Sequence, residues 1–249
     1  MEHGTLAVHM QTPGCFTDAH LHTVEPDYGS GYPDLGDACM LMGCTAHKCE
    51  WDDMLSTTDT RIVRSIGIHP WYCDEWNVQT ESELRDLLES DTTLHVGEIG
   101  LDSKRGELRS QAPVFERQLG IASEMDRIAS IHSIGTEKEV LESIRSHGKG
   151  CRGIILHSYG SDSYVKPYSE LPCFFSISPR ILSRSETRVR RLLSSIPLDR
   201  LLLETDAPHQ GRNFTGMSNF ITIIAGSLDM EPSDLRELVN ENLGRLIHG

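Results

Sequence analysis

The sequence lacks several features that define whole classes of protein. It has no run of about 18 apolar residues, the length that a membrane-spanning helix needs. It has no basic N-terminal segment leading into an apolar run, so we expect no secretory signal. Its seven cysteines include no CxxC pair, and the spacing of Cys39, Cys44 and Cys49 matches no standard zinc site. These absences predict a cytoplasmic protein with reduced cysteines and no membrane partner.

Basic residues are also scarce. The chain has 23 of them against 37 acidic residues, and its formal net charge is −14. Proteins that coat nucleic acid usually neutralise phosphates with a basic surface. The acidic balance therefore argues against a non-specific nucleic-acid coat. It does not exclude an enzyme whose metal ions meet the phosphate, because bound cations can be the largest charges in a site.

Short β-branched or apolar runs recur roughly every 20 to 35 residues, the spacing of βα units. The runs are residues 16–20, 37–43, 62–69, 93–100, 128–132, 152–157, 173–178 and 200–205. Several are almost wholly apolar, which is typical of strands covered on both faces. Helix-like segments lie between them, at residues 80–90, 112–125, 136–148, 185–196 and 232–247. This alternation predicts an α/β fold, a (β/α)₈ TIM barrel of the metal-dependent hydrolase type.

The chain length and the helix boundaries complete this prediction. A barrel of this kind needs about 250 residues, and the chain has 249. Residues 1–15 show no sustained period and are expected outside the barrel core, whereas residues 16–249 should form a single domain. Thr80 is expected to cap the helix at 80–90. Gly148 is expected to end the helix before it.

Side chains that bind metals follow six of the eight predicted strands. They are His20, His22, His69, Glu98, His132, His157 and Asp206. The strands of a TIM barrel are parallel, so their C-terminal ends meet at the face where active sites of this fold lie. Residues far apart in the sequence should therefore share one pocket.

Each of these residues alone has an ordinary explanation. His69 could be a loop histidine, Asp206 could cap a helix, and Glu98 could be a buried carboxylate paired with an arginine. Six strands that all end this way are harder to explain, because burying such groups together is costly unless a cation compensates them. The set also exceeds what one catalytic ion needs. It predicts two divalent metal ions with a bridging carboxylate between them.

The motifs that carry these residues resemble the TatD family of metal-dependent hydrolases. They are FTDAHLH, GIHP, VGEIGLD, ASIHS, GIILHSYGS and LLLETDAP, and the resemblance extends from Phe16 to the C-terminus. It implies a TIM-type barrel and a deoxyribonuclease with 3′→5′ exonuclease character, supported by Mg²⁺ or Mn²⁺. The substrate would be DNA, single-stranded or at its ends. The predicted imidazole ligands also suit Zn²⁺, so this metal is an alternative.

The resemblance also implies roles for individual residues. His20, His22 and Asp206 would hold one metal, His132 and His157 would hold the second, and Glu98 would lie between the two. His69 would contact the scissile phosphate.

The expected chemistry is the attack of a metal-activated water on a phosphodiester bond. Asp206 could take the proton of that water, and Glu204 could orient a metal ligand. Arg105, in the loop after Glu98, and Arg180, after the seventh strand, could hold substrate phosphates. Catalytic roles thus fall to Asp206, Glu98 and His69.

Two other functions remain open at this stage. Barrels host many chemistries, so a metal-dependent hydrolase of a small amide, ester or lactone is the main alternative. A binding protein that has kept the scaffold without its catalysis is the other. The pattern predicts no particular oligomeric state.

Overall fold

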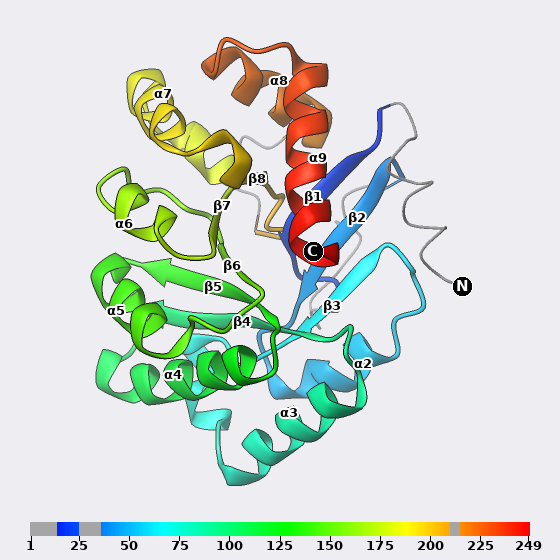
Figure 1. The fold of residues 1–249 in the computed structure, drawn as a ribbon, viewed down its shortest axis with the longest axis vertical. Helices are drawn as coiled ribbons and strands as arrows, with labels where there is room; N and C mark the ends of the chain where they lie inside the picture. The colour runs from blue at the N-terminus through cyan, green and yellow to red at the C-terminus, as the bar shows by residue number, and fades with distance from the viewer. Residues whose placement is uncertain (1–13, 25–35, 210–214) are drawn as a thin grey trace.

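The computed structural model describes residues 14–24, 36–209 and 215–249. In this part of the chain eight parallel strands pair side by side in sequence order. They are β1 (Phe16–Leu21), β2 (Ala38–Cys44), β3 (Ile62–Ile66), β4 (His95–Asp102), β5 (Ile128–Ile134), β6 (Gly153–Leu156), β7 (Cys173–Ile177) and β8 (Leu201–Leu203). All eight predicted strands and the TIM-barrel prediction are confirmed (Figure 1).

The last strand returns to the first through backbone contacts beyond its own end. The amide of Asp206 donates to the carbonyl of His20 at 3.0 Å, and the amide of His22 donates to the carbonyl of Ala207 at 2.8 Å. The buried carboxylate of Asp18 also accepts the amide of Thr205 at 2.9 Å. These contacts hold the segment after β8 against β1. They place Asp206 beside the two histidines of the first strand.

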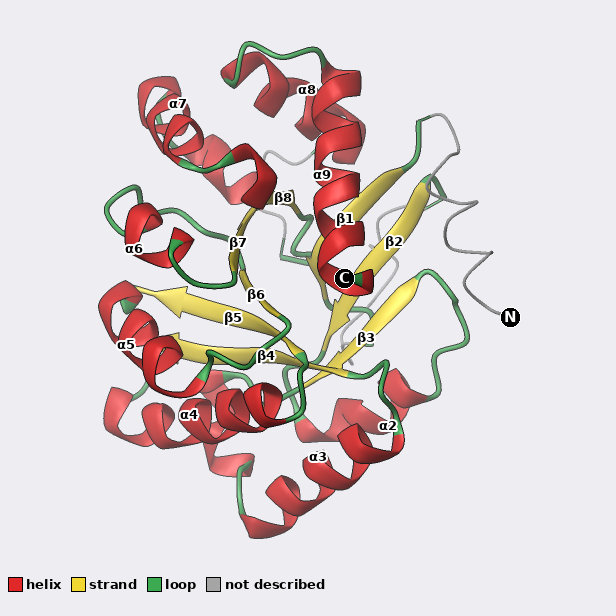
Figure 2. Ribbon diagram, viewed as in Figure 1, coloured by secondary structure: helices red, strands yellow, loops and turns green. Residues whose placement is uncertain are grey.

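Helices lie around the outside of the strands, as Figures 1 and 2 show. They are η1 (Lys48–Glu50), α2 (Trp51–Leu55), η2 (Pro70–Glu75), α3 (Val78–Ser90), α4 (Leu108–Glu124), α5 (Glu137–His147), α6 (Val165–Ser169), η3 (Pro179–Ser183), α7 (Glu186–Ser195), η4 (Leu198–Arg200), α8 (Met217–Ser227) and α9 (Pro232–His248). The five predicted helical segments form α3, α4, α5, α7 and α9. The helices α2, α6 and α8 were not predicted.

The two predicted helix boundaries had different outcomes. Gly148 lies at the C-terminal cap of α5, as predicted. The prediction that Thr80 caps α3 is wrong, because α3 begins at Val78 and Thr80 lies within its first turn. Asn77 is the cap, and its side-chain oxygen accepts the amides of Gln79 and Thr80. Val78 is exposed, so the apolar pattern did not reveal this first turn.

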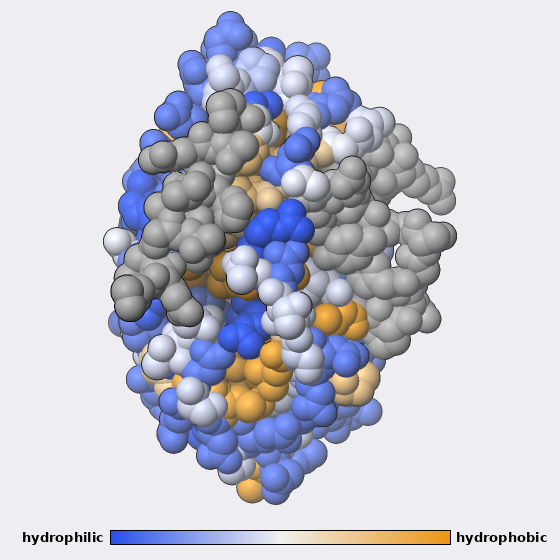
Figure 3. Space-filling view, turned by 90° about the vertical axis from the view of Figure 1, so that its right-hand side faces the viewer, coloured by the Kyte–Doolittle hydropathy of each residue, from blue (hydrophilic) through white to orange (hydrophobic). Residues whose placement is uncertain are grey.

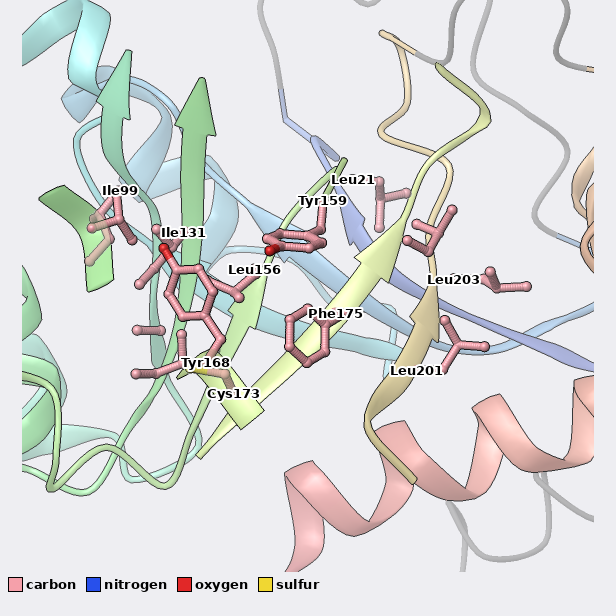
Figure 4. Close-up of a cluster of buried hydrophobic side chains, with 14 of the residues drawn as sticks. Leu21, Ile99, Ile131, Leu156, Tyr159, Tyr168, Cys173, Phe175, Leu201 and Leu203 are labelled. Carbon is pink, nitrogen blue, oxygen red and sulfur yellow. The ribbon is translucent and has the colours of Figure 1, made fainter. Parts of the chain in front are cut away.

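The apolar core lies on both sides of the strands, which explains their almost wholly apolar composition. Every residue of β1, β2 and β4 is buried. Figure 4 shows part of this core, where Leu156 and Phe175 lie near Tyr168 of α6. The hydroxyl of Tyr168 donates to the carbonyl of Glu137 at 2.6 Å. The rigid sheet fixes where each strand ends, and therefore where the polar side chains after it lie.

The surface agrees with the acidic, polar composition. Hydrophilic residues dominate the face drawn in Figure 3, and hydrophobic residues appear there in small patches. None of the described helices combines the length and apolar character needed to cross a membrane. Residues 1–13 of the predicted N-terminal extension lie outside the described residues, so that boundary stays a prediction.

Candidate metal centre

The structure brings all seven strand-end residues to one end of the barrel. His20, His22, His69, Glu98, His132, His157 and Asp206 are all buried. All except His20 line a cavity of about 620 Å³. His20 lies directly behind this wall, with its ring stacked on that of His157 at 3.8 Å between centroids. The structure thus brings residues that are far apart in the sequence together around one pocket, and their roles as ligands stay a prediction.

Glu98 lies at the centre of this group, and its two oxygens face different histidines. Oε2 is 3.2 Å from Nε2 of His22 and 3.4 Å from Nε2 of His20. Oε1 is 2.8 Å from Nδ1 of His132, and it lies 3.5 Å from Nε2 of His69 and 3.6 Å from Nε2 of His157. A carboxylate that faces two separate sets of nitrogens has the arrangement of a bridging ligand.

The glycine after Glu98 allows this strand to approach its neighbour. Gly100 has a φ of +146°, and a Cβ at this position would overlap the backbone of His132 on β5. The amide of Glu98 donates to the carbonyl of Thr45 at 2.8 Å, which anchors β4 on its other side. The motif VGEIG thus sets the distance between Glu98 and His132.

Three of the histidines have a polar partner on the ring nitrogen that points away from Glu98. Nδ1 of His20 is 2.8 Å from Oγ of Ser130. Nδ1 of His157 is 2.8 Å from Oε1 of Glu204, the carboxylate predicted to orient a ligand. Nε2 of His132 is 3.4 Å from Oδ2 of Asp102. Such partners fix the tautomer and direct the other nitrogen toward a cation.

Ser130 and Asp102 are two of these partners that the sequence reasoning missed. Asp102 follows Glu98 by four residues in VGEIGLD, so its position in a resembling motif was the available signal. Ser130 lies two residues before His132 on β5, and nothing in the sequence distinguishes it from an ordinary strand serine. Its role depends on the approach of β1 to β5 across the barrel, which only the fold reveals.

His69 is held differently from the other histidines. Its Nδ1 accepts the backbone amide of Trp71 at 3.2 Å. A neutral imidazole that accepts at Nδ1 carries its proton on Nε2. Nε2 of His69 therefore faces the cavity as a hydrogen-bond donor, which suits contact with an anionic group better than ligation of a cation.

The pKa of each ionisable group in the centre depends on its burial and on the charged groups beside it. Burial alone favours neutral histidines and lowers the pKa of His20 and His69. Burial also acts on His157, but Glu204, Asp206 and Glu98 outweigh it and raise its pKa to about 10. Burial likewise opposes ionisation of Glu98, yet the surrounding histidines hold its pKa well below its usual range. These histidines thus favour a charged carboxylate at the middle of the centre.

The donor set fits a divalent cation. Three groups place one ligand atom from each residue within 4.8 Å of the others: His20 with His22 and Glu98, His20 with His157 and Asp206, and His69 with Glu98 and His132. Among the described residues, the buried Nε2 of His20 makes no well-aligned hydrogen bond and faces only the Glu98 carboxylate at 3.4 Å, as expected of an atom that binds a cation. These groups associate His157 with His20 and Asp206, whereas the family resemblance associates it with His132.

The two predicted phosphate-binding arginines are placed differently. Arg180 lines the cavity, and its guanidinium is 3.7 Å from Oδ2 of Asp206. Arg105 is stacked over the indole of Trp71, 3.9 Å from the ring centroid. Trp71 itself lines the cavity, and the sequence reasoning did not identify it.

A TIM barrel with buried histidines and carboxylates at the C-terminal ends of its strands is the arrangement of a metal-dependent hydrolase. The family model described as TatD related DNase matches residues 17–248, and the chain belongs to that family. The 3′-5′ ssDNA/RNA exonuclease TatD of Erwinia tasmaniensis is 32% identical over 148 residues. This match covers 58% of the chain and 57% of that relative, little more than half of either.

Two solved structures share the fold. The crystal structure of YJJV, a TatD homolog from Escherichia coli, has a TM-score of 0.79 at 21% identity and covers 93% of this chain and 97% of its own. A TatD-family hydrolase from Entamoeba histolytica has a TM-score of 0.78 at 14% identity, with the same coverage of both chains. At these identities the likeness establishes the barrel alone.

Proposed function

We propose that this protein is a divalent-metal-dependent exonuclease that removes nucleotides from the 3′ end of single-stranded DNA. The observation that carries the proposal is the buried Glu98 carboxylate, whose two oxygens face five histidines from four strands or their ends. Further support comes from the related exonuclease named above and from the family to which the chain belongs.

Six residues would hold two cations in this enzyme. They are His20, His22, Glu98, His132, His157 and Asp206. Glu98 would lie between the cations, because each of its oxygens faces a separate group of nitrogens. The family resemblance favours Mg²⁺ or Mn²⁺, whereas the four imidazoles also suit Zn²⁺. When bound, such cations lower the pKa of a water and neutralise charge on the attacked phosphoryl group.

The protein's own groups bind the phosphate and move the proton. Nε2 of His69 donates to a non-bridging phosphate oxygen, because its other ring nitrogen already accepts the Trp71 amide. The guanidinium of Arg180 reaches the same phosphate from the side of Asp206. The Asp206 carboxylate accepts the proton that the attacking water loses. Glu204 keeps the His157 ring in place through the contact at Nδ1.

The test is the digestion of a single-stranded oligonucleotide carrying a label at its 5′ end. With Mg²⁺ or Mn²⁺ we expect a ladder of shortened products, and with EDTA we expect none. His132→Ala and Asp206→Ala should both abolish the ladder. His147→Ala is the matched control, because this histidine is exposed on α5 and should leave cleavage unchanged.

Three outcomes contradict the proposal. Cleavage that persists in His132→Ala or Asp206→Ala would come from a contaminant. Products that start from the 5′ end, or a single internal cut, would exclude the exonuclease assigned here. An intact oligonucleotide together with metal-dependent turnover of an ester, amide or lactone would favour the small-molecule hydrolase.

A further inference from the structure

Two large apolar side chains lie exposed in a cavity that is otherwise lined mostly by polar groups. Trp71 and Ile134 are each 38% exposed, and both line the cavity. The other exposed large apolar residues of the described chain are Val78, Leu198 and Ile223, and they lie elsewhere. An exposed indole beside a phosphate-binding centre suggests contact with an apolar part of the substrate.

Two hydrogen bonds, one from the side chain and one from the backbone, fix the position of Trp71. Its Nε1 donates to Oδ2 of the buried Asp102 at 2.6 Å, and its backbone amide donates to His69. Asp102 ends β4, and in the pairing of β4 with β5 it lies beside Ile134. The two exposed apolar side chains therefore belong to the same end of β4. The carboxylate that holds Trp71 also contacts the outer ring nitrogen of His132, which links the indole to the metal centre.

A cation completes this surface. The guanidinium of Arg105 lies over the indole face at 3.9 Å from its centroid. Arg105 is itself exposed, so one side of the guanidinium remains open to solvent. Indole and guanidinium planes are the groups on which unpaired nucleobases stack, and this stacking tolerates any base because every base has a π face.

We propose that Trp71, together with Arg105 and Ile134, forms the platform that binds the nucleobase next to the scissile phosphate. Asp102 is the positioning residue that fixes the plane of the indole. The platform gives the enzyme a preference for base-containing single strands without a preference for sequence. This inference rests on the proposed nuclease function, because a base stacked on Trp71 affects cleavage only when its phosphate lies at the metal centre.

The experiment compares two oligonucleotides of equal length. One carries ordinary bases throughout, and in the other the two 3′-terminal nucleotides are abasic tetrahydrofuran residues. Stacking of a base on an aromatic side chain corresponds to roughly 5- to 150-fold in binding. We expect wild type to show a kcat/KM ratio in this range in favour of the ordinary oligonucleotide. Trp71→Ala should reduce the ratio to near one, and Trp71→Phe should keep much of it.

Two controls separate this inference from its premise. Ile223→Ala removes an equally exposed apolar side chain from α8 and should retain the wild-type ratio. Hydrolysis of bis(p-nitrophenyl) phosphate, which has no nucleobase, reports the phosphodiester chemistry of each variant. If wild type cleaves neither this ester nor DNA, the proposed function fails and the platform with it. If it cleaves both and Trp71→Ala keeps the wild-type ratio, the platform alone is overturned.

A second measurement needs no turnover. In EDTA, a nucleobase that stacks on Trp71 quenches its fluorescence, so the ordinary oligonucleotide should quench wild type more than the abasic one does. Trp71→Phe should lose this difference, because the remaining Trp51 is buried and Trp76 is not among the cavity-lining residues. Equal quenching of wild type and Trp71→Phe would contradict the platform.

Discussion

Buried histidines occupy both ends of the barrel, and they differ in charge. His95 begins β4 at the end opposite the candidate metal centre, where the charges of Arg152 and Arg127 lower its pKa more than those of Asp91 and Asp126 raise it. Burial and these two cations lower its pKa to about 3. His157 is buried to a similar degree, but three carboxylates raise its pKa to about 10. Burial makes a histidine neutral by default, and only the placement of carboxylates turns it into part of a charged centre.

The polar side chains at the two ends of the barrel also differ in the groups to which they hydrogen-bond. At the end near His95, the side-chain amide of Asn242 donates to the carbonyls of Leu198 and Leu201, which secures the chain entering β8. At the other end, Glu204 and Asp102 contact histidines that face Glu98. Polar groups at the first end satisfy the backbone, whereas those at the second orient side chains. Substitutions at the end near His95 should therefore lower the free energy of unfolding. Substitutions at the metal end should instead lower metal affinity and cleavage.

Of the substitutions that test this comparison of the two ends, Glu204→Gln at the metal end should have the largest effect. The neutral amide cannot stabilise the His157 ring as the carboxylate does, so metal affinity and cleavage should each fall by roughly 10- to 100-fold. Isothermal titration with Mn²⁺ and the oligonucleotide assay measure the two losses. Glu142→Gln on the exposed face of α5 is the matched control. If Glu204→Gln bound Mn²⁺ as tightly as wild type does, the claim that polar groups at the metal end orient the metal ligands would be wrong.

Much of the fold and of the metal end could be predicted from the sequence, because both depend on short-range patterns. A buried parallel strand appears as an apolar run. His157 and Asp206 lie just beyond the ends of such runs, and Glu98 lies within β4. The parallel barrel then brings these ends together without further information. This prediction did not require the pairing register of individual residues.

What the sequence did not reveal depends on side chains meeting across the barrel. The contact of Ser130 with His20 joins two strands that do not pair directly. Trp71 was missed because a tryptophan after His-Pro gives no sign of whether it enters the core or the cavity. Arg105 was expected to face phosphates as a loop cation, but its stacking on Trp71 depends on where η2 turns the indole.

The second prediction tests the opposite end. Asn242→Ala removes the side-chain donor that the carbonyls of Leu198 and Leu201 share and should lower the free energy of unfolding by about 1–3 kcal/mol. Metal affinity and cleavage per folded molecule should stay at the wild-type values. Urea unfolding of the metal-free protein measures the first, and Mn²⁺ titration measures the second. A loss of metal affinity comparable to that of Glu204→Gln would show that the two ends are not separable.

The smallest effect is the pH dependence that the titration of His95 gives to the free energy of unfolding. Its pKa is near 6.5 when unfolded and about 3 when folded, so the unfolded chain binds an extra proton as pH falls through 6.5. The contribution of His95 is therefore complete above pH 7 and declines toward acid. Between pH 7 and pH 6 the decline should be below about 1 kcal/mol. His95→Gln removes the titrating group while leaving an oxygen that can accept the Ile128 amide.

The readout is the difference in unfolding free energy between wild type and His95→Gln, measured by urea unfolding at several pH values in EDTA. Both proteins keep the same histidines at the metal end, so the pH dependence of those groups cancels in the difference. The difference should be constant above pH 7 and should shift in favour of the variant as pH falls from 6.5 toward 5. Parallel curves over this range would mean that His95 takes up its proton equally in the folded and unfolded states, and the contrast in charge between His95 and His157 would then be wrong.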